Sequence, residues 1–374
     1  MVLQKYIILI NFIFWFTTIC GANNAINTIS RSDTTKVKNQ LLGYPIAYYL
    51  PETGFGGGFA GFYTFRFKGE TTKSNPSQIL TSLSYTQKNQ VLLSAISELY
   101  KFENKLKIKA ELGYFKYRYN FFGIGPNSLK SNLETYEVAF PRVRLDVLNL
   151  IGNTYVGLRY RFDSYGPLSF NPEGRLKDLD IKGKLGGIIS GIGLITQHDT
   201  RDYIYFPTKG YYIEAEIYTN KSWTGSDFNY TRFGIDAATY FDLKRNRVIA
   251  LNLITSVVSG NAPFNDLPYF GSPRIMRGTQ DRRFIGNSFL TLQSEYRFPI
   301  YKIISGVGFC SAGNVSDKYG DLFRKNNETP LLHIAFGAGI RILVNKADRI
   351  RVRLDYGHNP GEGGAFYITI NDAF

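Results

Sequence analysis

The sequence has little of the chemistry that most enzymes and metal proteins use. Its 374 residues include 2 Cys, 3 His, 2 Met and 2 Trp. Cys20 lies in an apolar leader segment, so the rest of the chain holds one thiol, Cys310, and cannot form an internal disulfide. His198, His333 and His358 show no metal-ligand spacing. We therefore expect no metal, no cofactor and no enzymatic activity.

Two further absences exclude common protein classes. Beyond the leader, no stretch reaches the ~18 consecutive apolar residues of a membrane-spanning helix, and the nearest, 185–195, is rich in Gly. Gly-x-Ser-x-Gly is missing, and the run 56–61 matches Gly-x-Gly-x-x-Gly without a strand, turn and helix around it. The formal net charge is +14, but the cations are dispersed. They favour a basic interior or anionic lipid headgroups over nucleic acid.

The first 22 residues have the features of a secretory signal peptide. Lys5 precedes an apolar run that ends at the small residues Gly21 and Ala22. A lipoprotein cysteine at Cys20 is the alternative, although Ile19 stands where a small residue is expected. We expect a signal peptide at 1–22, a short N-terminal arm at 23–42 and one domain at 43–374.

What the sequence does have is period-two alternation and an excess of aromatic residues, with 29 Phe, 27 Tyr and 37 Gly. In 105–114, 210–219 and 349–356, apolar side chains occupy one face and charged or polar ones the other. A Lys or Arg that faces lipid costs about 2–4 kcal/mol at the bilayer midplane, so the charged face must point into a wet lumen. The pattern predicts a transmembrane β-barrel, with a soluble β-sandwich as the alternative.

The alternation predicts sixteen antiparallel strands, an even number typical of outer-membrane barrels. Pro141 makes the sixth strand a weak one. Arg349, Arg351 and Arg353 would line the lumen as a solvated wall or form an anion-selective constriction. The predicted strands are 43–50, 55–67, 78–87, 90–102, 105–119, 134–147, 154–163, 185–199, 210–219, 229–242, 246–259, 288–298, 303–315, 331–344, 349–357 and 364–371.

Connections between these strands differ in length. Tight turns at Lys88-Asn89, Glu103-Asn104 and Arg245-Asn246 suit the periplasmic end. Longer segments at 120–133, 164–184, 220–228, 260–287 and 316–330 suit the exterior. The longest of these, 260–287, carries Met276-Arg277-Gly278-Thr279, and the strand after it places Glu295 on its polar face. We expect this loop to fold into the lumen.

Three segments together resemble the BamA/TamA family of outer-membrane barrels, also called the bacterial surface antigen family. The motif at 276–279 is similar to the family's lumen-loop motif, although Met276 and Thr279 depart from the usual Val and aromatic residue. The chain also ends on an aromatic residue, Phe374. The third segment resembles the family's strand-turn-strand signature and contains Asp199, Arg201, Asp202, Phe206, Pro207 and Gly210.

The resemblance implies partners for the loop arginine. Inward-facing acids hold it in such barrels, and Glu295 stands in place for that role. The family's second acid belongs to a Phe-x-Asp-x-Gly strand, which here begins at Phe309 and has Ser311 in the position of Asp. We therefore expect Glu295, Phe309 and Ser311 to anchor the loop, with a weaker, neutral anchor at Ser311.

The resemblance also concerns the two ends of the barrel. Phe366, Ile368, Ile370 and Phe374 resemble the C-terminal signal that directs barrels to the insertion machinery, although Asp372 interrupts the apolar face. The family's first and last strands pair poorly, so that the seam can open and template a client strand. A Gly cluster at 54–58 beside the first strand fits a weak seam, or simply eases tight curvature.

The resemblance implies a barrel-only member, since no periplasmic repeat domain precedes the barrel in this sequence. We expect it to lie in the outer membrane of a Gram-negative bacterium and to assist insertion or transport of proteins there. Its expected partners are outer-membrane lipids, client outer-membrane proteins and separate periplasmic chains, with no nucleic acid. The alternatives are a passive anion-preferring channel and a structural subunit of an envelope complex.

Overall fold

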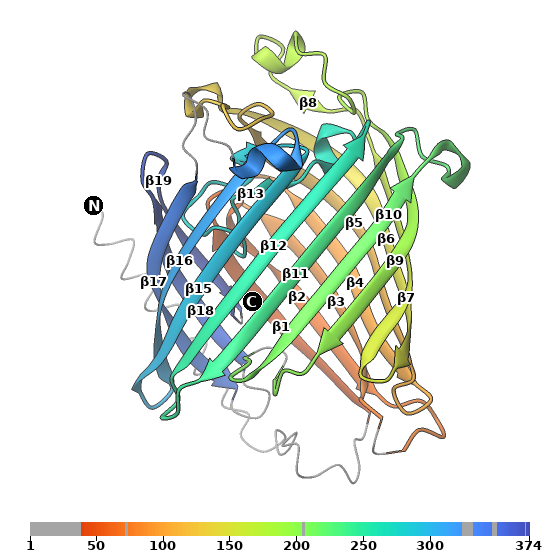
Figure 1. Ribbon diagram of the computed structural model, residues 1–374, viewed down its shortest axis with the longest axis vertical. Helices are drawn as coiled ribbons and strands as arrows, with labels where there is room; N and C mark the ends of the chain where they lie inside the picture. The colour runs from red at the N-terminus through yellow and green to blue at the C-terminus, as the bar shows by residue number, and fades with distance from the viewer. Residues whose placement is uncertain (1–38, 72–73, 204–205, 324–331, 346–349, 371) are drawn as a thin grey trace.

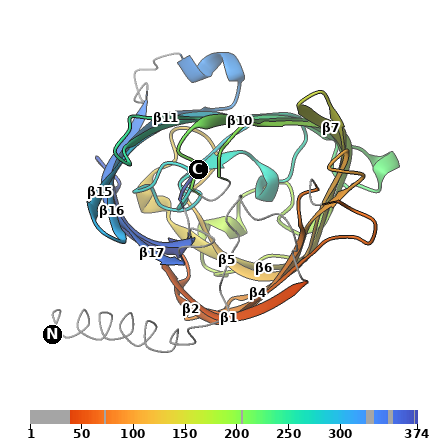
Figure 2. The same ribbon diagram turned by 90° about the horizontal axis from the view of Figure 1, so that it is seen from below.

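The computed structural model describes residues 39–71, 74–203, 206–323, 332–345, 350–370 and 372–374. The predicted signal peptide lies outside these residues. Sixteen antiparallel strands close into a barrel, which confirms the predicted fold (Figures 1 and 2). No helix among the described residues is long and apolar enough to cross a membrane.

Consecutive strands pair in a meander, and most lie within a few residues of their predicted positions. The barrel strands are β1 (Gln40–Leu50), β2 (Gly54–Phe65), β3 (Ser77–Thr86), β4 (Val91–Lys101), β5 (Leu106–Phe121), β6 (Glu134–Ile151), β7 (Thr154–Tyr165), β9 (Gly187–Asp199), β10 (Gly210–Asn220), β11 (Tyr230–Asp242), β12 (Val248–Gly260), β15 (Ser288–Tyr301), β16 (Ile304–Ser316), β17 (His333–Asn345), β18 (Ile350–Asn359) and β19 (Gly363–Ile370).

The connections carry the remaining short elements. Two-residue β8 (Ser169–Phe170) pairs with β6, while β13 (Tyr269–Phe270) and β14 (Phe284–Ile285) form a separate hairpin inside the longest connection. The 3₁₀ helices are η1 (Lys130–Asn132), η2 (Arg175–Lys177), η3 (Ser222–Thr224), η4 (Phe264–Asp266) and η5 (Tyr319–Phe323).

Strand β6 passes straight through Pro141, which the sequence had marked as a weak point. Pro141 faces Tyr114 of β5 on one side. On the other side, the β6–β7 pairing ends at Arg142 and Asp163, so Pro141 itself faces no residue of β7. The missing N–H of Pro141 therefore falls where no ladder bond to β7 is needed.

The turn at Lys88-Asn89 lies at the opposite end of the barrel from the one predicted. The Gln90 side chain donates to the Arg118 carbonyl at 3.2 Å, and Arg118 is close to the end of β5 that leads into 122–133. We call the end of the barrel that carries 122–133 and the other long connections the long-connection end. The connection 66–76 lies at the other end, where Asn75 N–H donates to the Asn104 side chain at 2.6 Å. The turns at Glu103-Asn104 and Arg245-Asn246 lie there, as predicted.

The two faces of the strands differ as the alternation predicts. Phe59, Leu158, Leu292 and Phe366 are each more than half exposed on the outer face, where lipid replaces water. At the long-connection end the lumen is filled by a cluster of buried apolar side chains. That cluster joins inward strand residues to Phe264, Leu267 and Ile285 of the longest connection, 261–287.

Candidate functional site

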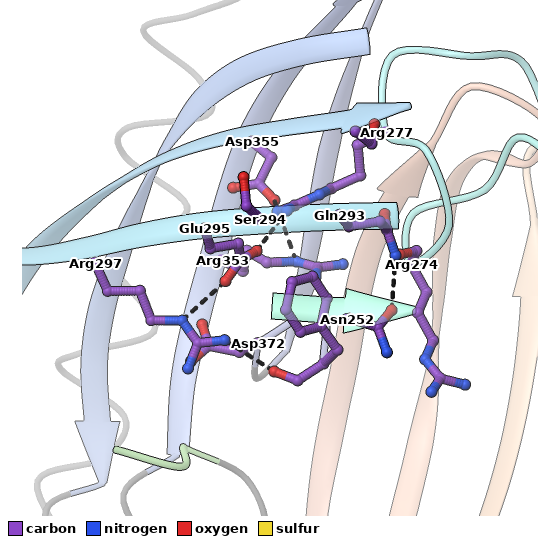
Figure 3. Close-up of polar contacts among 12 residues, drawn as sticks. Asn252, Arg274, Arg277, Gln293, Ser294, Glu295, Arg297, Arg353, Asp355 and Asp372 are labelled. Atoms are coloured by element: carbon purple, nitrogen blue, oxygen red, sulfur yellow. Dashed lines mark hydrogen bonds and ion pairs between the residues drawn. The ribbon is translucent and has the colours of Figure 1, made fainter. Parts of the chain in front are cut away.

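A closed ring of charged side chains lies inside the barrel, beside the longest connection. Figure 3 shows this region, with Arg277, Glu295, Arg297, Asp355 and Asp372 labelled. Three arginines alternate with three carboxylates, and each group contacts two of the opposite charge. In order around the ring they are Arg277, Glu295, Arg297, Asp372, Arg341 and Asp355. We call this set the arginine–carboxylate ring.

The contacts of the ring are short. Arg277 Nη1 lies 2.6 Å from Asp355 Oδ2, and Arg277 Nη2 donates to Glu295 Oε1. Arg297 Nε lies 2.8 Å from Glu295, and Arg297 Nη1 lies 3.2 Å from Asp372. Arg341 lies 2.8 Å from Asp372 and 2.5 Å from Asp355. Each side chain is at most 3% exposed, so each charge depends on its partners to offset lost hydration.

Alternation along the strands places these groups in the lumen. Glu295 and Arg297 are two residues apart on β15, so they share its inward face. Arg341 comes from β17, Asp355 from β18 and Asp372 from the segment after β19. Arg277 comes from the connection between β12 and β15. The ring thus joins the tip of the loop to the last strands of the barrel.

The predicted loop motif is buried at this site. Met276 is fully buried and its backbone N–H donates to the Gln293 side chain at 2.9 Å. Arg277 is 2% exposed and lies over the Phe309 ring at 3.7 Å, a distance typical of a cation–π contact. Thr279 is fully buried and its hydroxyl meets the Asn359 side chain at 2.8 Å.

Gly278 allows the motif to approach β18 backbone to backbone. Its φ is 99°, and a Cβ placed there would lie 2.5 Å from the His358 nitrogen. Across the contact, a Cβ on Gly357 would lie 2.5 Å from the Gly278 nitrogen. Both positions therefore require glycine. The Gly278 N–H donates to the Tyr367 hydroxyl at 3.1 Å.

Two of the three predicted anchors contact Arg277, and the third does not. Glu295 and Phe309 meet its guanidinium, whereas the Ser311 hydroxyl donates to the Ala335 carbonyl at 3.3 Å. The second acid is Asp355 of β18, so the expectation of a neutral, weaker anchor was wrong. The sequence offered one signal for Asp355, its place on the charged face of the predicted strand 349–357.

Arg353 adds a fourth arginine beside the ring. Its Nε lies 3.6 Å from Asp355 and donates to the Thr369 hydroxyl at 2.6 Å. Arg351 faces the same way and lies over the Phe206 ring at 3.2 Å. Arg349 lies outside the described residues. Arg351 and Arg353 thus have polar and aromatic partners, as a lumen wall requires.

The strand-turn signature converges on the same region. Arg201 forms a two-bond contact with Asp199 at 2.9 and 2.7 Å. The Pro207 carbonyl accepts from Arg297 Nη1 at 3.2 Å, so the turn reaches under the lumen to the ring. The φ of Gly210 is 96°, and a Cβ there would lie 2.4 Å from the Thr200 carbonyl.

Asp202 organises this turn. Its carboxylate accepts from the backbone N–H groups of Tyr203 at 3.0 Å, Thr208 at 2.8 Å and Lys209 at 3.3 Å. Desolvation alone would raise the pKa of Asp202, but the hydrogen bonds from Thr208, Lys209 and Tyr203 outweigh it and lower the pKa. Asp202 is therefore held ionised in the folded turn.

The C-terminal residues divide between the two faces. Phe366 is 60% exposed on the outer face and Ile368 is half-buried, while the side chain of Ile370 lies outside the described residues. Phe374 instead points inward and packs against Ala238, Tyr240, Val248 and Ala250. The end of the chain lies within the ring of strands in Figure 2. Arg297 Nη2 donates to the Phe374 carbonyl at 2.8 Å, so Phe374 does not continue the outer apolar row.

Two more arginines hold the long connection in the lumen. Arg282 donates to the Phe264 carbonyl at 3.0 Å and lies over the Tyr269 ring at 4.6 Å. Arg283 lies 2.7 Å from Glu362 in the β18–β19 turn and donates to the Ser128 carbonyl at 2.9 Å. Arg283 therefore ties the long connection to the β18–β19 turn and to the β5–β6 connection.

A second charged region lies across the lumen, against β4 to β7 and β10. Arg159 lies 2.6 Å from Asp146 and 3.3 Å from Glu214, and Arg161 lies 2.9 Å from Glu216. Asp146, Arg159 and Arg161 border a cavity of about 240 Å³, together with charged residues such as Glu98 and Lys109. Because acids and bases line it in similar numbers, the cavity has no strong preference for one sign of charge.

The arginine–carboxylate ring is built to hold the loop in place. Among the described residues, no group of three or more His, Cys, Asp or Glu is placed to hold a metal ion. The acids of the ring are engaged by arginines. What the site can do is hold the long connection inside the barrel through buried charge.

Comparison with known proteins agrees with this architecture. Residues 66–374 match a family model described as the Omp85 superfamily domain. No curated protein matches the sequence. Among solved structures, BamA from Haemophilus ducreyi lacking POTRA domains 1–3 is similar, with a TM-score of 0.60 and 14% identity over 90% of this chain and 71% of that one.

Two further solved structures share the fold. CdiB from Escherichia coli has a TM-score of 0.61 and 10% identity, over 88% of this chain and 62% of its own. CdiB from Acinetobacter baumannii has a TM-score of 0.56 and 15% identity, over 89% of this chain and 59% of its own. The chain thus spans less than two thirds of either CdiB protein, and at these identities the likeness concerns the fold.

Proposed function

The chain belongs to the Omp85 superfamily, and on that premise we propose that it assists the insertion or transport of proteins at the outer membrane. It is a β-barrel of the Gram-negative outer membrane. Barrels of this superfamily are transport or assembly factors. The proposed role in insertion or transport depends on how the first and last strands pair to close the barrel.

The seam between the first and last strands is the observation that carries the proposal. Among the described residues, β1 and β19 share a single facing pair, Tyr49 and Ile368. By contrast, β1 and β2 face each other along their whole length, from Gln40 and Thr64 to Leu50 and Gly54. Most of the outer edge of β1 is therefore available to pair with an incoming strand.

The filled lumen favours this activity over a passive anion channel. Loop residues such as Phe264 pack into an apolar cluster that occupies the long-connection end. Lumen cations such as Arg159 and Arg277 are paired with carboxylates, so they do not form a free anion path. A route through the side of the barrel remains compatible with this arrangement.

Its partners follow from the same proposal. Client outer-membrane proteins would add a strand at the seam, and outer-membrane lipids surround the apolar outer face. Delivery of an unfolded client would fall to separate periplasmic chains.

A locked seam tests the proposal. Tyr49→Cys and Ile368→Cys, in a Cys310→Ser background, would place two thiols on facing residues at a spacing that suits a disulfide. Full-length protein in liposomes should accelerate folding of a urea-unfolded outer-membrane barrel severalfold, measured by gel shift. The oxidised double variant should fall to the rate of empty liposomes and recover with reductant.

A matched cross-link controls for the disulfide itself. Ile213→Cys with Ala237→Cys joins a facing pair on β10 and β11, away from the seam, and should leave the folding rate unchanged. An oxidised seam variant as active as the reduced one would contradict the proposal. A steady conductance in planar bilayers without any effect on client folding would favour the channel.

A further inference from the structure

Two cations stand on the lipid-facing side of the barrel at the long-connection end. Lys116 and Arg118 are exposed on β5, while Phe115, Tyr117 and Tyr119 alternate with them on the inner face. Below them on the outer face come Tyr114 and Leu112, which are 45% and 57% exposed. The two cations therefore begin where the apolar band ends, at the level of lipid headgroups.

This placement is confined to one strand. Among the strand residues that the structure describes, Lys116 and Arg118 are the only Lys or Arg on the outer face in the half of the barrel toward the long connections. On β11, β6 and β7 the arginines of that half point inward. The position of Lys116 and Arg118 is therefore not part of a general spread of positive charge over the outer face.

The charges of the pair are largely uncommitted. Arg118 Nη2 donates to the Thr135 hydroxyl at 2.9 Å, which leaves its charge unneutralised. Lys116 has no hydrogen-bond or ion-pair partner within the described part of the chain. Glu137 faces Arg118 across the β5–β6 pair, without an ion pair between them there. The patch keeps a net positive charge at the membrane surface.

An apolar groove of about 480 Å³ runs on the outer face next to the pair. Gly43 and Gly61, which have no side chains, lie on its floor, and Phe59, Leu83 and Leu93 border it. The strand register connects groove and cations, since Leu93 faces Tyr114 and Val91 faces Lys116. The groove therefore lies on the membrane side of the basic pair.

We propose that Lys116, Arg118 and this groove bind a phosphorylated glycolipid of the lipopolysaccharide class. The long connections assign this end to the exterior, where the outer leaflet carries sugar-linked phosphates. Two cations about 7 Å apart on one face of a strand can each meet a phosphate, and an acyl chain fills the groove. This site is independent of the proposed activity in protein insertion.

Lipid binding to the purified full-length barrel in detergent tests the site. Native mass spectrometry would measure the affinity for bisphosphorylated lipid A, its dephosphorylated form and phosphatidylglycerol. Lipid A should bind at least tenfold more tightly than either. Lys116→Gln with Arg118→Gln should remove that difference, whereas Lys101→Gln with Lys105→Gln, exposed at the opposite end, should preserve it.

The groove has its own test. A Cβ on Gly43 would meet its nearest atom, the Ala60 carbonyl oxygen, at 4.0 Å, so the backbone leaves room for a side chain there, and Gly43→Leu is chosen to place its side chain in the groove. It should weaken lipid A binding severalfold and leave binding of the deacylated, phosphorylated headgroup unchanged. Equal affinity of the wild type and the Lys116/Arg118 variant would overturn the proposal, with gel shift showing that both are folded. So would phosphatidylglycerol binding as tightly as lipid A.

Discussion

Arg277 is stabilised by ion pairs with two buried carboxylates, Glu295 of β15 and Asp355 of β18. Removing one partner of a buried ion pair leaves an uncompensated charge, which costs far more than the pair itself contributes. In the arginine–carboxylate ring, one substitution at Arg277 leaves Glu295 and Asp355 each short of a partner. The ring is therefore more sensitive to single substitutions than an isolated pair would be.

Arg277→Ala should destabilise the inserted loop by about 3–5 kcal/mol. The measurement is the temperature of the gel-shift transition, together with the amount of barrel in the outer membrane. Arg274→Ala is the matched control, because Arg274 lies on the same loop but its side chain is 53% exposed. If both variants behave as the wild type does, Arg277 does not hold the loop.

Asp355→Asn should weaken the loop far more than Ser311→Ala. Asp355 contacts Arg277 and Arg341 directly, whereas Ser311 makes one hydrogen bond to a backbone carbonyl, worth about 1 kcal/mol. Thermal transitions of the two variants measure the difference. A larger loss for Ser311→Ala would return the second anchor to the position that the family resemblance indicated.

Asp281 predicts a pH dependence of the loop. Desolvation, and then the nearby charge of Glu52, raise the pKa of Asp281 to about 8. In the unfolded chain the pKa of an Asp is about 3.9, so between these values the unfolded state ionises while the folded state keeps its proton. This group therefore costs stability as the pH rises from about 4 to about 8.

Asp281→Asn removes that cost. The thermal transitions of wild type and variant should coincide near pH 4, where both side chains are neutral, and the variant should be the more stable near pH 8. A difference between the two proteins that does not change with pH would show that Asp281 is already ionised in the folded loop.

At the residue scale, alternation along one strand was enough to place a side chain on its face. Glu295 was singled out because the family resemblance implies an inward-facing acid for the loop arginine and alternation puts Glu295 on the polar face, and the structure brings it to Arg277. Asp355 and Asp372 were missed as partners, because they approach Arg277 and Arg297 only when the barrel closes. Local pattern gives the face of a side chain but not which strands meet across the lumen.

At the scale of elements, the loop motif and β18 meet through two glycines. Gly357→Ala should displace the motif, since its Cβ would lie 2.5 Å from the Gly278 nitrogen and neither backbone can yield cheaply. We expect a lower thermal transition and increased protease cleavage within 261–287. Gly308→Ala, on β16 with open space around its Cβ, is the control and should show neither effect.

The strands themselves were predictable because charge and apolarity alternate along each of them. It was harder to predict at which end of the barrel each connection lies. Length suggested that the turn at Lys88-Asn89 lay with the other short turns, but its position follows from counting strands, and a short turn can occur at either end. The Phe374 packing likewise depends on an inward bend after β19, which no alternation reports.

For the whole molecule, the filled lumen predicts low conductance. Wild-type protein in planar bilayers should show closed or brief openings, because the apolar cluster around Phe264 and Leu267 occupies the long-connection end. Arg282→Ala, which removes contacts to the Phe264 and Asn265 carbonyls, should raise the open fraction severalfold. A large, steady pore in the wild type would contradict a lumen closed by the loop.

The shared contacts of Asp372 carry a thermodynamic reciprocity. Asp372 follows the terminal strand and binds Arg297 and Arg341, and Arg297 in turn shares Glu295 with the loop arginine. If the strand end moved away, Arg297 would lose Asp372 and interact more strongly with Glu295. Glu295 would then bind the loop arginine, Arg277, less tightly. Linkage then requires the converse with the same free energy, so that a ligand which pulls the loop outward must also loosen the end of the terminal strand.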